Sequence, residues 1–149
     1  MEYEQPDLTL LGADHVKRYR ETGGEVGYLW NGVPTLLLTT TGRRSGQQRT
    51  TPLIFGRDGD DYLVVASKGG APKHPLWFLN LQATAEAEIQ VRAERTAVTA
   101  RVAGDDERPR LWAAMAKIWP NYDVYETRTD RRIPVVVLTP SGPVRTEGD

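Results

Sequence analysis

Three arginines lie close together in the stretch LLLTTTGRRSGQQRTTPLIF, which covers residues 36–55. Arg43, Arg44 and Arg49 stand beside two glycines and between two apolar runs, with no acidic residue among them. A guanidinium group binds phosphate and carboxylate through paired hydrogen bonds, and glycines let backbone N–H groups approach an anion closely. A β-hairpin needs only about two to five turn residues. The loop is therefore either an anion-binding loop or a solvated basic turn, and its composition alone favours neither.

A second glycine-rich loop strengthens the anion-binding interpretation. SKGGAPKHP, residues 67–75, contains Lys68 and Lys73 and precedes a short helix that Pro75 is expected to begin. The amino-terminal end of a helix favours anions. We therefore expect the two loops to converge on one elongated anionic ligand. His74 is either a base or a helix cap, and its position beside the proline favours the cap.

Aromatic side chains supply a further element of a binding site. Trp77 follows the second loop, and Tyr122 and Tyr125 follow a long helix expected over residues 105–119. Trp112, on that helix, is predicted to pack in the core. The two tyrosines lie among polar residues and prolines, so they belong either to the mouth of a ligand pocket or to surface packing.

Composition argues against several other classes of site. The chain has 149 residues, a formal charge of −1 and no cysteine, which leaves no thiolate metal site, disulfide or cysteine nucleophile. His15 and His74 are too few for a metal centre. The dinucleotide-binding, Walker and nucleophile-elbow motifs are absent, and the central cations are too few for a nucleic-acid groove. Glu86 and Glu88 are interpreted as solvated strand positions rather than as a glycosidase pair.

The amino-terminal stretch MEYEQPDLTLLGADHVKRYR is acidic and contains no long apolar run. Neither a signal peptide nor a membrane span is predicted from it. We expect a cytoplasmic protein with at most peripheral membrane contact, and the oligomeric state stays open.

Turn signals define the elements that must position these residues. ADHVKRYRETGG predicts a short amphipathic helix ended by the glycine pair at 23–24. Asn31-Gly32 predicts a hairpin between two strands. After the arginine loop, RTTPLIFG and DDYLVVAS are predicted to pair around Asp58-Gly59.

Apolar periodicity predicts the fold class. The continuous apolar runs 36–38 and 63–66 indicate strands buried on both faces, whereas 85–91 and 95–103 alternate as half-solvated strands do. IPVVVLTP predicts a last strand. Consecutive hairpins with helices between some of them favour a mainly antiparallel barrel or sheet with flanking helices, an α+β protein. We expect one domain over residues 1–149, with residues 1–12 and 141–149 flexible.

Three strings together carry a family resemblance: LLLTTTGRRSGQQRTTPL, YLVVASKGGAPKHPLWFLNLQA and RRIPVVVL. They resemble the deazaflavin (F420)-dependent nitroreductase family of actinobacteria, which includes quinone and nitroimidazole reductases. The resemblance covers about Val16 to Leu138. It implies a split β-barrel related to flavin-binding oxidoreductases. It also implies coenzyme F420, an 8-hydroxy-5-deazaflavin whose side chain carries a phosphate and an oligoglutamate tail.

The resemblance also assigns roles to residues of this chain. By this resemblance, the phosphate is bound by Arg43, Arg44 and Arg49. The candidate catalytic residues near the acceptor are Tyr122, Tyr125 and Ser67, which would orient the acceptor or deliver a proton. The positions that border the deazaflavin are Pro52, Val65, Ala66, Ser67, Lys68, Leu76 and Trp77.

Two positions depart from the nitroimidazole reductase of the family. Ile54 and Trp119 stand where that enzyme has tyrosines. Both positions border the acceptor, so use of F420 is expected and activity on nitroimidazoles is expected to be weak. The resemblance implies an F420-dependent reductase that transfers a hydride to a quinone, enone or nitroaromatic. The alternatives are a flavin mononucleotide-dependent oxidoreductase on the same barrel and a non-catalytic module that binds F420.

Overall fold

The central strand of the protein comes from its first apolar run. In the computed structural model, which describes residues 3–144, β2 (Val33–Thr41) is buried continuously from Thr35 to Thr40. It pairs antiparallel with β1 (Leu29–Trp30), β3 (Gln48–Ile54) and β6 (Glu86–Val91). A strand with neighbours at both edges and side chains buried on both faces reads as an unbroken apolar run.

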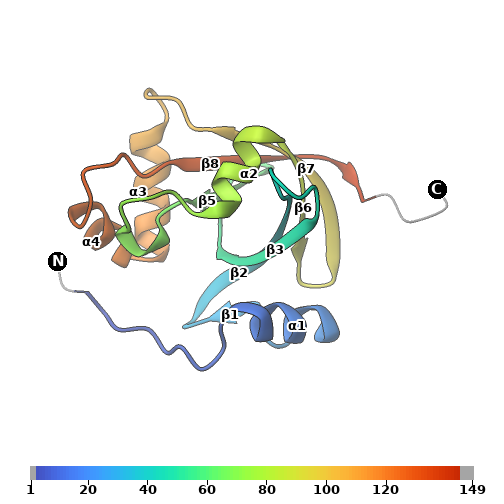
Figure 1. Cartoon of the computed structure of the whole chain (residues 1–149). Helices are drawn as coiled ribbons and strands as arrows, with labels where there is room; N and C mark the ends of the chain where they lie inside the picture. Colours follow the sequence, from blue (N-terminus) through green and yellow to red (C-terminus); the bar gives the residue numbers. More distant parts are fainter. Residues whose placement is uncertain (1–2, 145–149) are drawn as a thin grey trace.

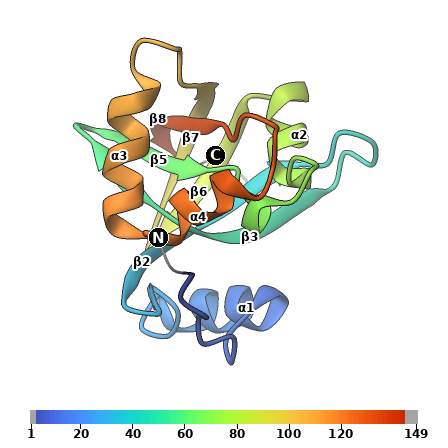
Figure 2. The ribbon, with the colours of Figure 1, turned by 90° about the vertical axis from the view of Figure 1, so that its left-hand side faces the viewer.

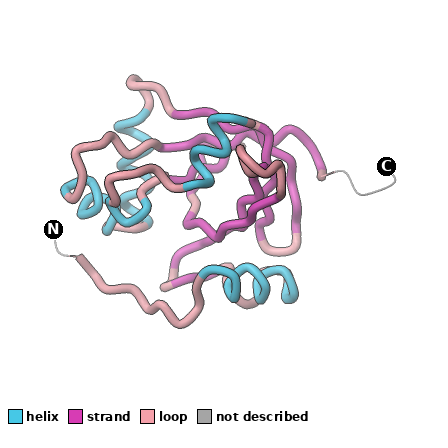
Figure 3. Tube along the Cα trace, viewed as in Figure 1, coloured by secondary structure: helices cyan, strands magenta, loops and turns pink. Residues whose placement is uncertain are grey.

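The remaining strands extend this sheet into a curved half-barrel (Figures 1 and 3). Its order within residues 3–144 is β1-β2-β6-β7-β8-β5-β4, with β3 paired to β2 outside that path, and every pairing is antiparallel. The strands not yet bounded are β4 (Gly56–Asp58), β5 (Asp61–Val65), β7 (Glu94–Val102) and β8 (Val135–Pro143). This confirms the predicted antiparallel β architecture.

The helices lie at the periphery of the sheet, as Figure 3 shows in cyan. α1 lies below the sheet in both ribbon views, away from the other helices (Figures 1 and 2). Gly23, in the left-handed region at φ 59°, ends α1 as predicted. The helical elements are α1 (Gly12–Thr22), the 3₁₀ turn η1 (Lys68–Gly70), α2 (Leu76–Ala83), α3 (Arg108–Ile118) and α4 (Asn121–Thr127).

Two apolar clusters explain why Leu63, Val64 and Val65 of β5 are all apolar. Val64 packs with Leu36, Leu38 and Phe78 in a cluster of the barrel and α2. Leu63 and Val65 belong to a second cluster, which the sheet forms with α3 and α4. Successive strand residues point to opposite faces, so each face of β5 meets a different core.

Tyr19 fastens α1 to the sheet. Its fully buried hydroxyl lies 3.0 Å from the carbonyl oxygen of Thr35 on β2 and 3.3 Å from that of Gln90 on β6. The same oxygen accepts the backbone N–H of Arg92 at 2.8 Å. Three groups on two elements therefore hold one side chain, which fixes where the rest of α1 lies.

The structure corrects several predicted boundaries. The segment RTTPLIFG is not one strand: β3 pairs with β2, the chain turns at Phe55, and only β4 pairs with β5. The acidic residues expected in the first turn of α3 precede it, with Glu107 at the N-cap. The last strand continues to Pro143, so residues 141–143 belong to β8. The rest of the predicted flexible tail, residues 145–149, lies outside the described residues, as do residues 1–2.

No helix within residues 3–144 is long and apolar enough to cross a membrane.

Candidate active site

The arginine loop is a closed hairpin turn between β2 and β3. The N–H of Gly42 donates to the carbonyl of Gln47 at 2.7 Å, and the N–H of Gly46 donates to the carbonyl of Gly42 at 2.8 Å. Gly46 has a φ of +73°, a conformation that favours glycine. The turn is therefore fixed by its backbone, and its side chains are left free to point outward.

Asn80 on α2 supports the base of this loop. Its side-chain Oδ1 accepts the backbone N–H of Arg43 at 3.1 Å, and its Nδ2 donates to the hydroxyl of Thr40 at 3.0 Å. Asn80 is buried, so both of its polar atoms are satisfied inside the protein. The sequence analysis did not single out this residue, because nothing local in NLQA indicates a partner some forty residues earlier.

The three arginines of the loop have no acidic partner among residues 3–144. Six ion pairs occur in that part of the chain, and none of them includes Arg43, Arg44 or Arg49. The arginines line a cleft of about 670 Å³, here called the basic cleft, which has no Asp or Glu in its wall. Its other lining residues are Gly42, Ser45, Gln48, Thr50, Thr51, Leu76, Trp77 and Asn80.

The second glycine-rich loop adopts a left-handed conformation. Lys68, Gly69 and Gly70 have φ values of 48°, 63° and 82°. A Cβ atom on Gly70 would lie 2.6 Å from the carbonyl oxygen of Tyr125, so only glycine lets the loop pack against α4. The loop therefore holds Ser67 and Lys68 at a fixed place beside α4.

Arg131 anchors the same loop from behind. Its guanidinium donates to the carbonyl oxygens of Ala66 at 3.2 Å, Ser67 at 2.6 Å and Ala71 at 2.8 Å. Burial lowers the pKa of Arg131 from its ordinary value. The sequence analysis did not identify Arg131 as a functional candidate, because its contacts lie about 60 residues away in the chain.

His74 also meets Arg131, which corrects its predicted role as a helix cap. α2 has no side-chain cap. The Nδ1 of His74 lies 3.1 Å from Nη1 of Arg131, and its ring lies 4.7 Å from that of Phe78. Burial lowers the pKa of His74, and the positive charge of Arg131 lowers it further. A neutral His74 can accept this hydrogen bond, since an arginine only donates.

A second cleft of about 430 Å³, here called the aromatic pocket, lies beside α4. Tyr122 and Tyr125 line it and are only 5% and 9% exposed, so the surface-packing alternative for them is wrong. Burial, and secondarily the neighbouring Tyr125, raise the pKa of Tyr122 well above its ordinary value. The Nε1 of Trp119 lies 3.5 Å from the hydroxyl of Tyr125. The other lining residues are Leu11, His15, Trp30, Thr35, Thr51, Pro52, Leu53, Ile54, Val65, Ser67, Lys68, Gly69, Pro75 and Trp77.

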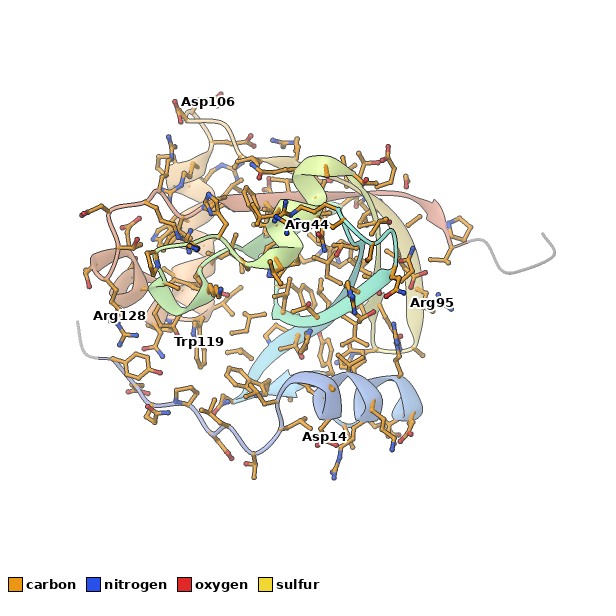
Figure 4. All side chains as sticks on the ribbon, viewed as in Figure 1. Asp14, Arg44, Arg95, Asp106, Trp119 and Arg128 are labelled. Carbon is orange, nitrogen blue, oxygen red and sulfur yellow. The ribbon has the colours of Figure 1, made fainter. Side chains whose placement is uncertain are left out.

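The basic cleft and the aromatic pocket adjoin, because Thr51 and Trp77 line both. Figure 4 shows the two ends of this site: Arg44 lies beside α2, and Trp119 lies above the amino-terminal segment. A charged, open end thus continues into an apolar, aromatic end. This arrangement suits a ligand with an anionic chain and a flat ring.

The amino-terminal segment runs along the aromatic end and is fastened there by two asparagines. Asn121 bonds both the N–H and the carbonyl of Glu4, at 3.0 and 2.8 Å. Asn31 does the same for Asp7, at 2.7 and 2.9 Å. Sequence reasoning had no signal for these contacts, since an isolated asparagine in a turn needs no distant partner.

Most of the sequence-predicted site residues come together along this site. The three arginines, Pro52, Val65, Ser67, Lys68, Leu76, Trp77, Tyr122 and Tyr125 all line one of its two ends. Ala66 lines neither end: it is fully buried, and its carbonyl binds Arg131. Lys73 is exposed and also lines neither end.

Comparisons with known proteins agree with this geometry. A family model described as F420H(2)-dependent quinone reductase matches residues 12–140. The F420H(2)-dependent quinone reductase Rv1261c of Mycobacterium tuberculosis (strain H37Rv) is 47% identical over 129 residues, which cover 84% of this chain and 87% of that protein. A solved F420-H2-dependent reductase, FDR-A, is 40% identical with a TM-score of 0.66, covering 70% of this chain and 93% of its own.

A more distant structure shows the breadth of the fold. The heme storage protein HutZ from Vibrio cholerae is 14% identical, with a TM-score of 0.52, over 90% of this chain and 91% of its own. This likeness concerns the fold alone. The architecture is a split β-barrel, as the family resemblance implied.

The fold is that of a split-barrel oxidoreductase, with an arginine-rich loop next to an aromatic pocket. The chain belongs to the F420H(2)-dependent quinone reductase family. It is therefore an enzyme of that family, with coenzyme F420 as its cofactor.

The residues of the site fit this cofactor. The donor set of the basic cleft is three guanidinium groups, together with the backbone N–H groups of Arg44 and Ser45, for which no hydrogen bond occurs within residues 3–144. These groups suit a phosphate and carboxylates. Trp77 and Pro52 offer flat apolar walls for a ring where the two ends of the site meet.

The contacts of Arg131 lead to a prediction about the second loop. Arg131→Met removes three charge-assisted hydrogen bonds to backbone carbonyls, so we expect a loss of unfolding free energy of about 2 kcal/mol or more. Arg131→Lys keeps the charge but lacks the planar guanidinium that reaches three carbonyls, so it should retain only part of this unfolding free energy. Thermal and urea unfolding measure the stability of both variants.

Arg132→Met is the matched control, because Arg132 is exposed and pairs only with the exposed Asp105 at the surface. It should change stability by less than about 0.5 kcal/mol. Equal stability of the Arg131 and Arg132 variants would contradict the anchoring role.

Proposed function

We propose that this protein reduces quinones with reduced F420 as the electron donor. The observation that carries the proposal is the continuity of the basic cleft with the aromatic pocket through Thr51 and Trp77. Family membership supports it, since the relative of M. tuberculosis is named as an F420H(2)-dependent quinone reductase. Enones and nitroaromatics are further candidate acceptors, because they are electrophiles of the same kind.

The residues of the basic end bind and orient the cofactor. Arg43, Arg44 and Arg49 would hold the phosphate and the first carboxylates of its tail by charge-assisted hydrogen bonds. β3 pairs with β2 along one edge and has no strand partner along its other edge within residues 3–144. Pro52 lies on β3 and lines the aromatic pocket. A proline has no N–H group to donate, so it is tolerated on such an edge strand. Bound reduced F420 supplies a hydride. The protein contributes binding, orientation and exclusion of water.

The residues of the aromatic end would receive the acceptor. Tyr122 and Tyr125 are buried and line the pocket, and Ser67 lines the same pocket. The raised pKa of Tyr122 keeps its hydroxyl protonated at neutral pH, so it acts as a hydrogen-bond donor rather than as a base. Ile54 and Trp119 also line this end. They shape an apolar slot that suits a flat quinone.

The reaction itself is the first test. Reduced F420 should be consumed when menadione is added to the purified protein, followed by the change in cofactor absorbance and fluorescence. Reduced nicotinamide cofactors should not substitute, because the family donor is F420. Tight F420 binding without turnover on any quinone, enone or nitroaromatic would contradict the proposal and favour a protein that only binds the cofactor.

The arginine loop makes a prediction about affinity. Arg43→Ala and Arg49→Ala should each weaken F420 binding by roughly ten- to a hundredfold, because each removes a charge-assisted contact with the anionic chain. Added salt should weaken the parent more than either variant, since the lost contact is the screened one. Quenching of F420 fluorescence measures these affinities.

Arg95→Ala is the control, because Arg95 is an exposed arginine of β7 that pairs with Glu88 and lines neither end of the site. It should bind F420 like the parent. The parent should also prefer F420 to flavin mononucleotide, which ends at its phosphate and leaves part of the basic cleft unpaired. Equal affinity for the two cofactors, or unchanged F420 affinity in both arginine variants, would show that the loop is only a solvated turn.

The tyrosines make a separate prediction about turnover. Tyr122→Phe and Tyr125→Phe should lower kcat and kcat/KM together while leaving F420 affinity nearly unchanged, as expected for hydrogen bonds made mainly in the transition state. Steady-state kinetics with menadione check this. Turnover equal to the parent in both variants would limit the rings to packing. Nitroimidazole reduction should stay weak because of Ile54 and Trp119, and robust activity would contradict that expectation.

A further inference from the structure

His15 is a buried polar side chain in the wall of the aromatic pocket. It belongs to α1, is 2% exposed, and lies on the side of the pocket formed by α1 and β2. Its Nε2 lies 2.8 Å from the carbonyl oxygen of Gly27. No cluster of side chains that could hold a metal ion occurs within residues 3–144, and the hydrogen bonds that fasten α1 to the sheet come from Tyr19 rather than from His15.

Gly27 fixes the position of this imidazole ring. Its φ is +100°, and a Cβ atom there would lie 2.7 Å from Cδ2 and 2.8 Å from Nε2 of His15. Only glycine therefore permits both the backbone conformation and the close approach. The ring is held against one carbonyl in one orientation.

This orientation determines which nitrogen is available to a ligand. A carbonyl oxygen only accepts hydrogen bonds, so Nε2 carries the hydrogen of the neutral ring. No hydrogen bond within residues 3–144 includes Nδ1 of His15. Every fully buried side-chain nitrogen or oxygen atom in that part of the chain has a partner. The unpartnered Nδ1 is therefore not fully enclosed by protein, and the aromatic pocket is an open space that His15 lines.

We propose that His15 is a catalytic residue that donates a proton from Nδ1 to an oxygen of the quinone acceptor. The inference rests on the proposed function. Two-electron reduction by a hydride from reduced F420 leaves one negative charge on the acceptor oxygen. The Nδ1–H bond of the imidazolium breaks, the O–H bond of the quinol forms, and the neutral imidazole regains its proton from solvent.

The other titratable groups near the pocket suit this role less well. Tyr122 has a pKa raised by burial, which makes its hydroxyl a weak acid. Tyr125 lies 3.5 Å from the indole Nε1 of Trp119, and Lys68 is exposed on the second loop. An imidazole ring has two nitrogen atoms, so it can keep the hydrogen that donates to Gly27 on one and give up a proton from the other.

The charged neighbours on the elements around His15 are occupied elsewhere. On α1, Tyr19 lies with its ring 6.3 Å away and its hydroxyl bonded to the sheet, and Asp14 pairs with Arg18 at the surface. On β3, Arg49 belongs to the basic cleft. None of these groups replaces the imidazole as a proton donor.

The variant His15→Gln distinguishes the hydrogen bond to Gly27 from the proposed transfer of a proton by Nδ1. The amide nitrogen of Gln takes the place of Nε2 and can still donate to Gly27, but it has no titrating Nδ1. We expect kcat/KM with menadione to fall about 100-fold, while F420 affinity stays within twofold.

Lys17→Gln is the matched control, because it places the same side chain at an exposed position of α1. It should retain the parent rate. If the parent does not reduce menadione, the proposed function is overturned and this inference with it. If the parent is active and His15→Gln keeps the parent rate, only the role of His15 is overturned.

A measurement on the cofactor-free parent tests the same geometry without turnover. The chain has two histidines, so His15→Gln assigns their imidazole signals directly. Nitrogen and Cδ2 chemical shifts should place the hydrogen of neutral His15 on Nε2. The opposite tautomer would overturn the proposal, because Nδ1 would then lack the lone pair that takes up the proton.

Discussion

The pairing of β3 with β2 is the constraint on which the site depends. Seven residue pairs, from Thr35 with Ile54 to Thr41 with Gln48, set the register of the hairpin. A slip of one residue would move β3 by about 3.3 Å and exchange its two faces. This register places Arg49 at the basic end of the site and Ile54 at the aromatic end. The two ends are therefore separated by the length of one strand.

Charge distribution follows from this geometry. Six arginines elsewhere within residues 3–144 pair with carboxylates, as Arg101 does with Glu107. The hydrogen bond from Arg101, with a second from the N–H of Gly104, lowers the pKa of Glu107 to about 2. The arginine loop has no such partner within residues 3–144. Cations gathered in one turn without acids repel one another, and an anionic ligand removes that repulsion. The loop therefore adds little to stability, and binding of an anionic ligand is the role that we propose for it.

The aromatic end depends on contacts between segments that are distant in sequence. Arg131, just before β8, holds the carbonyls around Ser67, and α4 packs its Tyr125 against Gly70. α1 brings His15 to the opposite side, where Gly27 receives it. A ring and its acceptor would lie between these parts. The polar groups are few and each is held by a second residue, which is how a mainly apolar pocket orients a small substrate.

The sequence by itself determined the hairpins, the doubly buried strands, the family and the arginine loop, because turn chemistry and apolar periodicity act over a few residues. Asn31-Gly32, the run 63–66 and the glycines around Arg43 needed no distant partner to be interpreted. Tertiary structure decided the burial of Tyr122, the anchoring of the second loop by Arg131 and the position of His15. Each of these depends on closure of the half-barrel, which brings together groups many residues apart. Many polar residues have the local sequence of exposed positions, and no local pattern specifies which of them become buried when the half-barrel closes.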